Sequence, residues 1–300
     1  PKGYQAEEDS DAIRVSEYWG KKTNQIQSPK ISFEFFPPRS DTAKKSLKET
    51  HLKLSSINPE HYSVTFGALG TSQDATFDTI VNLSKDTEIP ITPHLTCVDT
   101  NKKQVTELID KYISHGVNQV MVLKGDTPSK PLHKGDFEYA NEMVKFIKEH
   151  YDNIDILVAA YPEKHPHSMN IRTDIDFFVD KVNSGATQAI TQYFYNIDAY
   201  FHYIDELQKR NIDIPITPGI MPITNYEQLI NFSKTCGAEI PAWILNRLKL
   251  YRHDPESLKE FGQDVVSEMC LNLKENGVNS FHFYSMNKAE PVLSISKILI

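Results

Sequence analysis

Short runs of β-branched and aromatic residues alternate with longer, amphipathic stretches along most of this sequence. Eight of the runs predict strands, and most start about 26 to 36 residues after the preceding one, a spacing that suits a strand followed by a helix. Eight strands in alternation with helices predict an α/β fold that closes into a (β/α)8 barrel, or TIM barrel, as a single domain. The predicted strands are 31–36, 61–66, 91–97, 119–125, 155–162, 189–195, 215–222 and 280–286.

Helical periodicity fills the intervals between these runs. Residues 42–57, 101–115 and 174–184 predict helices. Gly116 and Gly185 follow two of these segments, at the position where a glycine commonly ends a helix. Within 101–115 the apolar residues recur with the i, i+3, i+4, i+7 spacing of one helix face: Val105, Leu108, Ile109 and Tyr112.

The beginning of the chain and the interval before its last predicted strand depart from this regular pattern. Residues 1–30 lack a sustained apolar period, so we expect a short helix near 11–19 and a loop that precede a barrel domain at 31–300. The long interval before the last strand predicts two or three helices. A doubly wound open sheet is the alternative fold, but no G-x-G-x-x-G motif follows the first strand.

Alternation within the first three predicted strands separates an apolar face from a partly polar one. In the first strand, Ser32 and Glu34 share the face opposite to Ile31, Phe33 and Phe35. The second and third strands alternate in the same way. The apolar faces predict contact with helices, and the polar faces predict a lumen with a ligand at its C-terminal mouth.

Composition narrows the classes of function. The chain has 39% hydrophobic residues and a formal charge of −8, which indicates a globular protein and disfavours one that wraps nucleic acid. We expect no membrane association, because no run approaches the roughly 20 apolar residues that span a bilayer and the polar start does not resemble a signal peptide. Three scattered cysteines, Cys97, Cys236 and Cys270, suit a reducing, cytoplasmic location.

Two short segments could carry chemistry at the predicted mouth. Glu34 stands in FEFFPPR, where burial among aromatic residues would raise its pKa and suit it to proton donation. Its alternative role is an ion pair with a lysine at the barrel rim. In the second segment, Lys124-Gly125-Asp126, the glycine would let the backbone approach a planar ligand closely, although the segment also fits an ordinary turn.

The loop after the fifth predicted strand offers further candidates. Its sequence, Tyr161-Pro-Glu-Lys-His165-Pro-His167, fits no standard zinc pattern, so we expect no metal and interpret Tyr161 and His165 as contacts to a heterocycle. Gln192 in the sixth strand could bind a heterocycle through its amide. Gln192 and His94 could equally be core residues with satisfied hydrogen bonds.

Eight segments, taken in order, carry a resemblance that no single segment provides. They are FEFFPPR, VTFGA, PHLTC, LKGD, AAYPEKHP, AITQYFY, PGIMP and FHFYSMNKAE. From about residue 30 to 300 the chain resembles the methylenetetrahydrofolate reductases, in their short, bacterial-type catalytic form.

This resemblance implies a (β/α)8 barrel with FAD bound non-covalently at the C-terminal mouth. It also implies a ping-pong reaction in which NADH or NADPH reduces the flavin. The flavin then reduces 5,10-methylenetetrahydrofolate to 5-methyltetrahydrofolate, which supplies methyl groups for methionine synthesis. We expect NADH as the donor, since the short form resembles the NADH-dependent enzymes, and a homo-oligomer as the assembly.

Roles for individual residues come from the same resemblance. Glu34 would be the general acid that opens the folate's five-membered ring, and Asp126 would tune the flavin and help to bind the pterin. The substrate would contact Gln192, Tyr226, Met286 and Lys288. The cofactor would contact Thr65, His94, Leu123, Lys124, Gly125, Asp126, Tyr139, Ala140, Ala159, Tyr161, His165, Asp174 and Lys181.

A few positions depart from the family pattern. Lys124 and Lys288 replace arginines, so that at Lys124 a bidentate contact becomes a point charge. Tyr226 replaces a phenylalanine. Phe177 and Asp180 stand where an asparagine and an arginine are expected near the cofactor phosphates, and an aspartate there would repel a diphosphate.

Two other functions remain open at this point. A metal-dependent hydrolase or aldolase could use His94, His165 and His167, and it would bind a divalent ion without colour. A barrel that only binds a pterin or flavin would not need a proton donor at Glu34.

Overall fold

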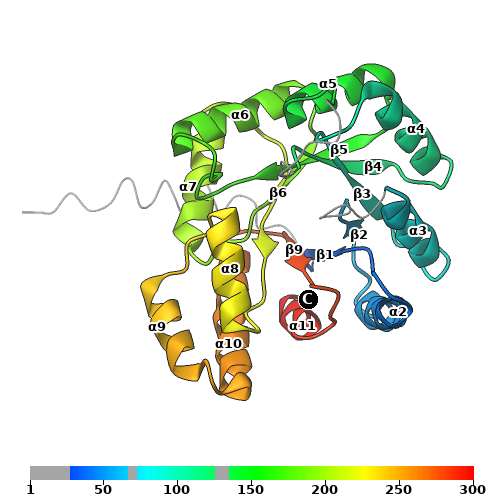
Figure 1. Cartoon of the computed structure of the whole chain (residues 1–300). Coiled ribbons are helices and arrows are strands. Elements are labelled where there is room, and N and C mark those ends of the chain that lie inside the picture. The colour runs from blue at the N-terminus through cyan, green and yellow to red at the C-terminus, as the bar shows by residue number, and fades with distance from the viewer. Residues whose placement is uncertain (1–27, 67–72, 126–134) are drawn as a thin grey trace, which may run out of the picture.

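The computed structural model describes residues 28–66, 73–125 and 135–300, and its strands form one parallel sheet that curves into a nearly closed barrel with helices outside (Figure 1). The order of the strands around the sheet is β7-β6-β5-β4-β3-β2-β1-β9-β8. The predicted (β/α)8 barrel is therefore confirmed. The strands are β1 Lys30–Phe35, β2 His61–Val64, β3 Ile91–Thr96, β4 Gln119–Leu123, β5 Asp155–Ala160, β6 Gln188–Thr191, β7 Ile216–Thr217, β8 Gly219–Ile220 and β9 Ser280–Tyr284.

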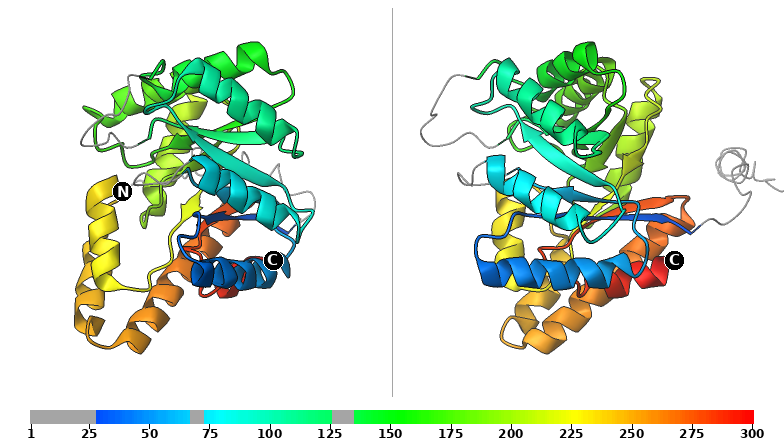
Figure 2. Two further views of the ribbon diagram at one scale, coloured as in Figure 1. Left: turned by 45° about the vertical axis from the view of Figure 1, so that its right-hand side comes forward. Right: turned by 90° about the vertical axis from the view of Figure 1, so that its right-hand side faces the viewer.

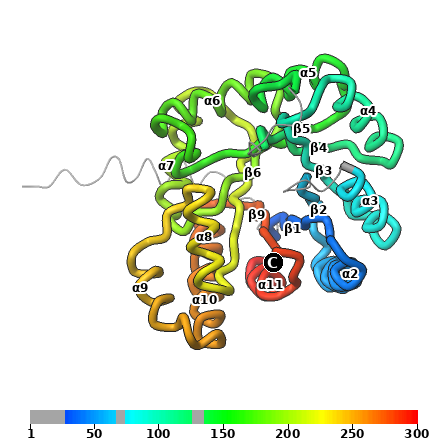
Figure 3. The backbone as a smooth tube through the Cα atoms, in the orientation of Figure 1, coloured from blue at the N-terminus to red at the C-terminus, as the bar shows by residue number. Residues whose placement is uncertain are grey.

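Helices follow the strands on the outside of the barrel, and Figure 2 shows α2 running alongside β1. Three helices occupy the long interval before β9, as predicted, and Figure 3 shows them grouped at one side of the barrel. The predicted helix near 11–19 lies outside the described residues. The helices are α2 Asp41–Ser55, α3 Gln73–Ser84, α4 Lys102–Ile113, α5 Ala140–His150, α6 Ile171–Asn183, α7 Ile197–Gln208, α8 Tyr226–Cys236, α9 Ala242–Tyr251, α10 Pro255–Glu275 and α11 Val292–Leu299.

The ends of the helices follow from local sequence. Asn101 begins α4 with a capping box, in which its side chain accepts from the backbone N–H of Gln104 at 2.9 Å. The four apolar residues predicted for one face of this helix are buried. Asn170 caps α6 and starts it three residues before the predicted Asp174. Gly116 and Gly185 have φ values of +80° and +117°, which confirms their role after the helix ends.

The seventh predicted strand is divided at Pro218 into β7 and β8. Proline has no N–H to donate to a ladder, so the strand breaks there, although the Pro218 carbonyl accepts from His282 N–H at 3.0 Å. β7 pairs with β6, whereas β8 pairs with β9. The two ends of the sheet are therefore consecutive in sequence, and eight predicted strands become nine.

Aromatic side chains fill the layer between the first strands and the helices. Phe33, Phe35 and Tyr62 are fully buried, and the ring centroids of Phe35 and Tyr62 lie 5.1 Å apart. Such a pair adds about 0.5–1.5 kcal/mol to the stabilisation from burial. This packing confirms that the odd-numbered residues of β1 face outward, so Ser32 and Glu34 face the lumen. No helix among the described residues is long and apolar enough to cross a membrane.

Gly219 is the tightest point where the sheet closes. Its N–H donates to Thr191 Oγ1 at 2.9 Å, and an added Cβ would lie 2.1 Å from the carbonyl oxygen of Thr191. We expect Gly219→Ala to lower the free energy of unfolding by about 2 kcal/mol or more, because backbone atoms would have to move. Urea denaturation measures this effect.

Gly116→Ala is the control for this substitution. No atom lies within 4 Å of an added Cβ at Gly116, but its φ is +80°. The control should therefore cost only about 1 kcal/mol, from backbone strain alone. Equal losses in the two variants would contradict the packing explanation.

Candidate active site

Most of the described residues predicted for the site gather at the carboxyl ends of the strands, because parallel strands of a barrel all end at the same mouth. Thr65 and Gln192 come directly after β2 and β6, and Gly125 is two residues beyond β4. His94 and Ala159 lie near the ends of β3 and β5. Asp126 lies outside the described residues, so its predicted role is untested.

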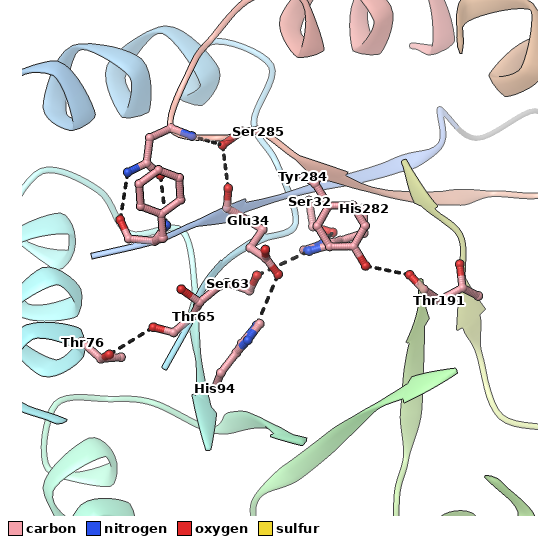
Figure 4. Close-up of polar contacts among 12 residues, drawn as sticks. Ser32, Glu34, Ser63, Thr65, Thr76, His94, Thr191, His282, Tyr284 and Ser285 are labelled. Carbon is pink, nitrogen blue, oxygen red and sulfur yellow. Dashed lines mark hydrogen bonds and ion pairs between the residues drawn. The ribbon is translucent and has the colours of Figure 1, made fainter. Parts of the chain in front are cut away.

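Glu34 is the central acidic group of the lumen, and Figure 4 shows it between His94 and Tyr284. In the strand register it lies opposite Ser63 of β2 and Tyr284 of β9. Its Oε2 is 3.7 Å from His94 Nε2, and its side chain is only 21% exposed. The rim lysine, Lys30, pairs with Glu60 instead. The alternative role of Glu34 as the partner of a rim lysine is therefore wrong.

Burial makes both members of the Glu34–His94 contact neutral near pH 7. It raises the pKa of Glu34 to about 8. It also lowers the pKa of His94 to about 3, with the neighbouring His61 adding to the shift. The contact is therefore between a protonated carboxyl and a neutral imidazole and is not an ion pair. The outward-facing phenylalanines do not surround this carboxyl, so its desolvation comes from the closed lumen.

The lumen has one polar wall and one apolar wall. The polar wall, on β9, β1, β2 and β3, includes Glu34, Ser63 and His94. The apolar wall, on β4, β5 and β6, is a separate cluster of Met121, Leu157 and Ile190, with Leu123 and Ala159 packed against it. The sequence predicted the polar wall. The two walls together suit a flat ligand that presents hydrogen-bonding groups to one side and an apolar surface to the other.

Two lysines and three aromatic rings lie at the mouth. Lys124 Nζ is 4.7 Å from the centroid of the Tyr139 ring. Lys181 Nζ donates to the Ala159 carbonyl, and burial lowers the pKa of this lysine to about 8. Tyr161 packs edge-on against His165, with ring centroids 4.7 Å apart.

Asp174 fixes the loop that carries His165. Its carboxylate accepts from Ser168 Oγ at 2.6 Å and from His165 N–H at 3.2 Å. Burial lowers the pKa of His165, although Asp174 opposes this shift. The buried Asp174 therefore positions the loop, and its charge also opposes the lowering of the Lys181 pKa.

Gly125 brings the backbone close to the polar wall at the end of β4. Its φ is +82°, and an added Cβ would lie 2.9 Å from Thr96 Cβ. Only glycine fits this conformation and this space without strain. The backbone at Gly125 leaves room for a planar ring, and Lys124 and Lys181 can donate hydrogen bonds to an anion. This combination would fit a flavin dinucleotide, which has both a planar ring and a diphosphate.

The two departures on α6 are at exposed positions. Asp180 is exposed and lines a surface hollow with Lys145 and Lys148 of α5. Phe177 is 53% exposed. The carboxylate of Asp180 thus lies near lysines of α5. Their positive charge would reduce the repulsion between Asp180 and a diphosphate.

The loop between β9 and α11 forms the other side of the mouth. Met286 and Lys288 line a small groove with residues of α8 and of the loop before it. Tyr226, the first residue of α8, does not line this groove. Met286 and Asn287 both have a left-handed φ, 52° and 55°, a conformation that is uncommon for residues other than glycine.

Side chains of this loop tie it to the end of β1. Asn287 Oδ1 accepts from Phe36 N–H at 3.0 Å, and Asn287 Nδ2 donates to the Phe36 carbonyl at 2.9 Å. Ser285 Oγ donates to the carbonyl of Glu34 at 2.6 Å. The backbone at Glu34 is thereby held from the neighbouring strand.

Several polar residues of the lumen were missed in the sequence. Tyr284 donates to the Thr191 carbonyl at 2.7 Å, and its pKa is raised well above its usual range by burial and by Glu34. His61 and His282 also face inward. The alternation in HYSV and SFHFY was the signal for these residues, because their apolar neighbours face the helices.

Gln192 has a partner within the protein. Its Oε1 accepts from the Tyr193 N–H at 3.0 Å. This contact agrees with the alternative in which a backbone group satisfies the side-chain amide of Gln192. The two N–H donors at Nε2 could still bind a ligand. Among the described residues, no group of three or more His, Cys, Asp or Glu could hold a metal ion.

Comparison with known proteins identifies relatives over most of the chain. The sequence profile of the family described as Methylenetetrahydrofolate reductase matches residues 21–299. The 5,10-methylenetetrahydrofolate reductase of Buchnera aphidicola subsp. Schizaphis graminum is 39% identical over 265 residues, which are 88% of this chain and 89% of that protein. The enzyme of the same name from Escherichia coli K12 is 35% identical over 269 residues, 90% of each chain.

A solved structure shares the fold at low sequence identity. It is an uncharacterized protein from Clostridium thermocellum that binds two copies of 5-methyl-5,6,7,8-tetrahydrofolic acid. The TM-score is 0.61 at 16% identity, over 95% of this chain and 96% of that one. At this identity the likeness supports the barrel alone.

The raised pKa of Glu34 predicts how its removal changes stability with pH. The folded protein keeps this proton up to about pH 8, whereas the unfolded chain loses it near its ordinary pKa of 4.5. The folded state binds more protons in this window, so Glu34 lowers the free energy of unfolding as pH rises. Glu34→Gln should therefore gain stability relative to the parent by at least about 1 kcal/mol between pH 5 and 8.

Urea denaturation at these two pH values measures the change. Glu107→Gln is the control, because Glu107 is 63% exposed and forms only a surface ion pair with Lys103. Parallel stability curves for Glu34→Gln and the parent would show that Glu34 is already ionised in the folded protein.

Proposed function

Because the chain belongs to the methylenetetrahydrofolate reductase family, we propose that it reduces 5,10-methylenetetrahydrofolate with a hydride that NADH delivers through non-covalently bound FAD. The observation that carries this proposal is a protonated carboxyl, Glu34, held at the mouth of a lumen with one polar and one apolar wall. Family membership supports folate reduction itself. The cofactor, the donor and the order of steps are inferred.

The residues at the mouth fit the cofactor. Lys124 and Lys181 offer two ammonium groups for the diphosphate, and Gly125 allows close approach of the ring system. Tyr161 and His165 offer ring surfaces beside them. When bound, FAD would supply a two-electron carrier between NADH and the folate. We infer that NADH and the folate occupy the same place in turn, a ping-pong order.

Glu34 would act on the folate as a general acid. At pH 7 its carboxyl still carries a proton, because burial holds its pKa near 8. It can donate this proton to a nitrogen of the five-membered ring, so that the ring opens to an iminium that accepts hydride. The Ser285 hydrogen bond to the Glu34 carbonyl holds the acid in place, so little reorganisation is needed.

The name of one related protein supports NADH as the hydride donor. A protein from Arabidopsis thaliana named Methylenetetrahydrofolate reductase (NADH) 1 is 30% identical over 279 residues, which are 88% of this chain and 47% of that protein. The product, 5-methyltetrahydrofolate, would supply methyl groups for methionine synthesis. The second candidate function is a barrel that only binds its ligands. Such a protein would bind the flavin or the folate but would not catalyse the reduction.

Glu34→Gln should separate the two halves of the reaction. We expect NADH to bleach the flavin absorbance of the variant at the normal rate, since this step needs no proton from Glu34. Reoxidation by methylenetetrahydrofolate should slow by at least about a hundredfold, the usual contribution of a general acid. Anaerobic stopped-flow spectroscopy of both half-reactions tests this.

The same experiment on the parent protein tests the proposed function. A flavin spectrum that NADH bleaches and methylenetetrahydrofolate restores is the expected result. A protein that gains no flavin spectrum after addition of FAD would overturn the proposal. Bleaching and binding without reoxidation would favour the binding barrel.

Lys181→Met should weaken FAD binding by about tenfold or more, because a charged hydrogen-bond donor at the mouth is lost. Fluorescence titration of the apoprotein with FAD measures the dissociation constant. Lys145→Met removes the same charge from the exposed side of α5, where Lys145 pairs with Glu149, and should leave the affinity unchanged. Equal affinities in both variants would contradict a role for Lys181.

A further inference from the structure

Three histidines stand in the lumen beneath and beside Glu34, and the mechanism above uses none of them to move a proton. We call His61, His94 and His282 the histidine column. In the strand register Ser32 of β1 lies opposite both His61 of β2 and His282 of β9. Glu34 is two residues further along β1, so this layer lies directly below the layer of the acid.

Close contacts connect the column. The rings of His61 and His282 are stacked, with centroids 5.9 Å apart and an interplanar angle of 19°. His282 Nδ1 lies 2.7 Å from Ser32 Oγ, and His282 Nε2 lies 3.4 Å from Ser63 Oγ (Figure 4). Ser63 lies opposite Glu34 in the strand register.

The column also reaches Glu34 through His94. His94 Nε2 is 3.7 Å from Glu34 Oε2. His61 lies close enough to lower the pKa of His94, and both histidines lower that of His282. Glu34 is therefore approached by polar groups from β2, β3 and β9. Distances of 3.4–3.7 Å require a small approach or a bridging water during proton transfer.

The lower end of the column is at the N-terminal face of the barrel. His61 is the first residue of β2 and is 7% exposed. Its neighbour Glu60 pairs with Lys30, the first residue of β1, and both side chains are in solvent, at 40% and 67% exposure. The column thus runs from this face to Glu34, at the opposite end from the mouth where ligands enter.

Three histidines share one wall of the lumen, and their burial carries a cost. The Nε2 atoms of His61 and His94 are buried without a hydrogen-bond partner among the described residues, and a buried unsatisfied group costs about 1–3 kcal/mol. The opposite wall of the same lumen is filled by Met121, Leu157 and Ile190 at no such cost. Burial lowers the pKa values of all three histidines, so each neutral ring has one donor and one acceptor nitrogen.

We propose that the histidine column carries a proton from the N-terminal face of the barrel to Glu34 in each turnover. This proposal rests on the function proposed above, in which Glu34 gives its proton to a folate nitrogen and becomes a carboxylate. While the folate product, and then NADH, fill the mouth in turn, they separate this carboxylate from bulk solvent on that side. The column supplies the replacement from the other side.

The transfer balances one proton and no electrons. The Glu34 O–H bond breaks as the N–H bond of the folate forms. The carboxylate then takes a proton from the column, from the Nε2–H of His94 or the hydroxyl of Ser63. His282 Nε2 replaces the proton of Ser63, and Ser32 replaces that of His282 at Nδ1. The rings of His61 and His282 are stacked, so His61 supplies Ser32 through a bridging water and takes a proton from water at the rim. The net result is one solvent proton consumed, which reduction of the folate by NADH requires.

The test compares the first turnover with later ones in His61→Phe and His61→Gln. Both variants lack a group that carries protons, and glutamine keeps the site polar if phenylalanine disturbs folding. Glu34 already holds a proton at pH 7, so we expect normal flavin reduction by NADH and a normal first reoxidation by methylenetetrahydrofolate. Steady-state turnover should fall by about tenfold or more, and a small acid such as imidazole should restore it.

His51→Phe is the matched control. His51 is also fully buried with both ring nitrogens unpartnered among the described residues, but it packs on Phe35 and Tyr62 outside the barrel. It should turn over like the parent. Unchanged steady-state turnover in both His61 variants would overturn the proposal, as would an equal loss in the first and later turnovers.

A measurement on the parent protein does not depend on any variant. Steady-state rates in mixtures of H2O and D2O should vary nonlinearly with the D2O fraction, because several protons move together along the column. The first turnover should vary linearly, and linear behaviour in both regimes would count against the column. A parent protein that never reoxidises with the folate would instead overturn the proposed function.

Discussion

The desolvated carboxyl of Glu34 is the constraint on which the rest of this site depends. A carboxyl keeps its proton near pH 7 only where water cannot reach its charged form. Here the barrel closes around it, with Tyr284 on one neighbouring strand and Ser63 on the other. The hydrogen bond from Ser285 holds its backbone. The raised pKa of Glu34 therefore depends on closure of the barrel. A change in the geometry of the sheet would also change the protonation of Glu34.

The two walls divide the work of the lumen. The strands from β9 to β3 hold the groups that handle protons, whereas β4 to β6 present an apolar surface. Lys124, just after β4, and Lys181, in the last turn of α6 with its Nζ on the Ala159 carbonyl, add positive charge beside this surface. Each half of the barrel thus provides one kind of chemistry, and a flat ligand at the mouth would contact both.

Much of the fold could be predicted from the sequence, because the period of two in strands and the glycines after helices are local signals. The first three strands, the helix at 101–115 and the polar face with Glu34 all follow from such patterns. The break at Pro218, the pairing of Glu34 with His94 and the position of Asp180 depend on how distant segments meet. Tyr284 was within reach of the alternation rule, but its contact with Thr191 was not.

The junction at Pro218 has a consequence for motion. Its two sides, β7 and β8, have two residues each and belong to opposite ends of the sheet. No ladder joins β7 to β8, but two hydrogen bonds cross the junction, from Gly219 N–H to Thr191 Oγ1 and between the hydroxyls of Thr217 and Ser280. Individual hydrogen bonds, and no continuous ladder, hold the barrel at this point, so local widening costs less free energy here than elsewhere in the sheet. The hydroxyl of Tyr284 donates across this junction to the Thr191 carbonyl, and Tyr284 lies opposite Glu34 in the strand register. Small changes in this hydrogen bond would therefore alter the width of the lumen beside Glu34.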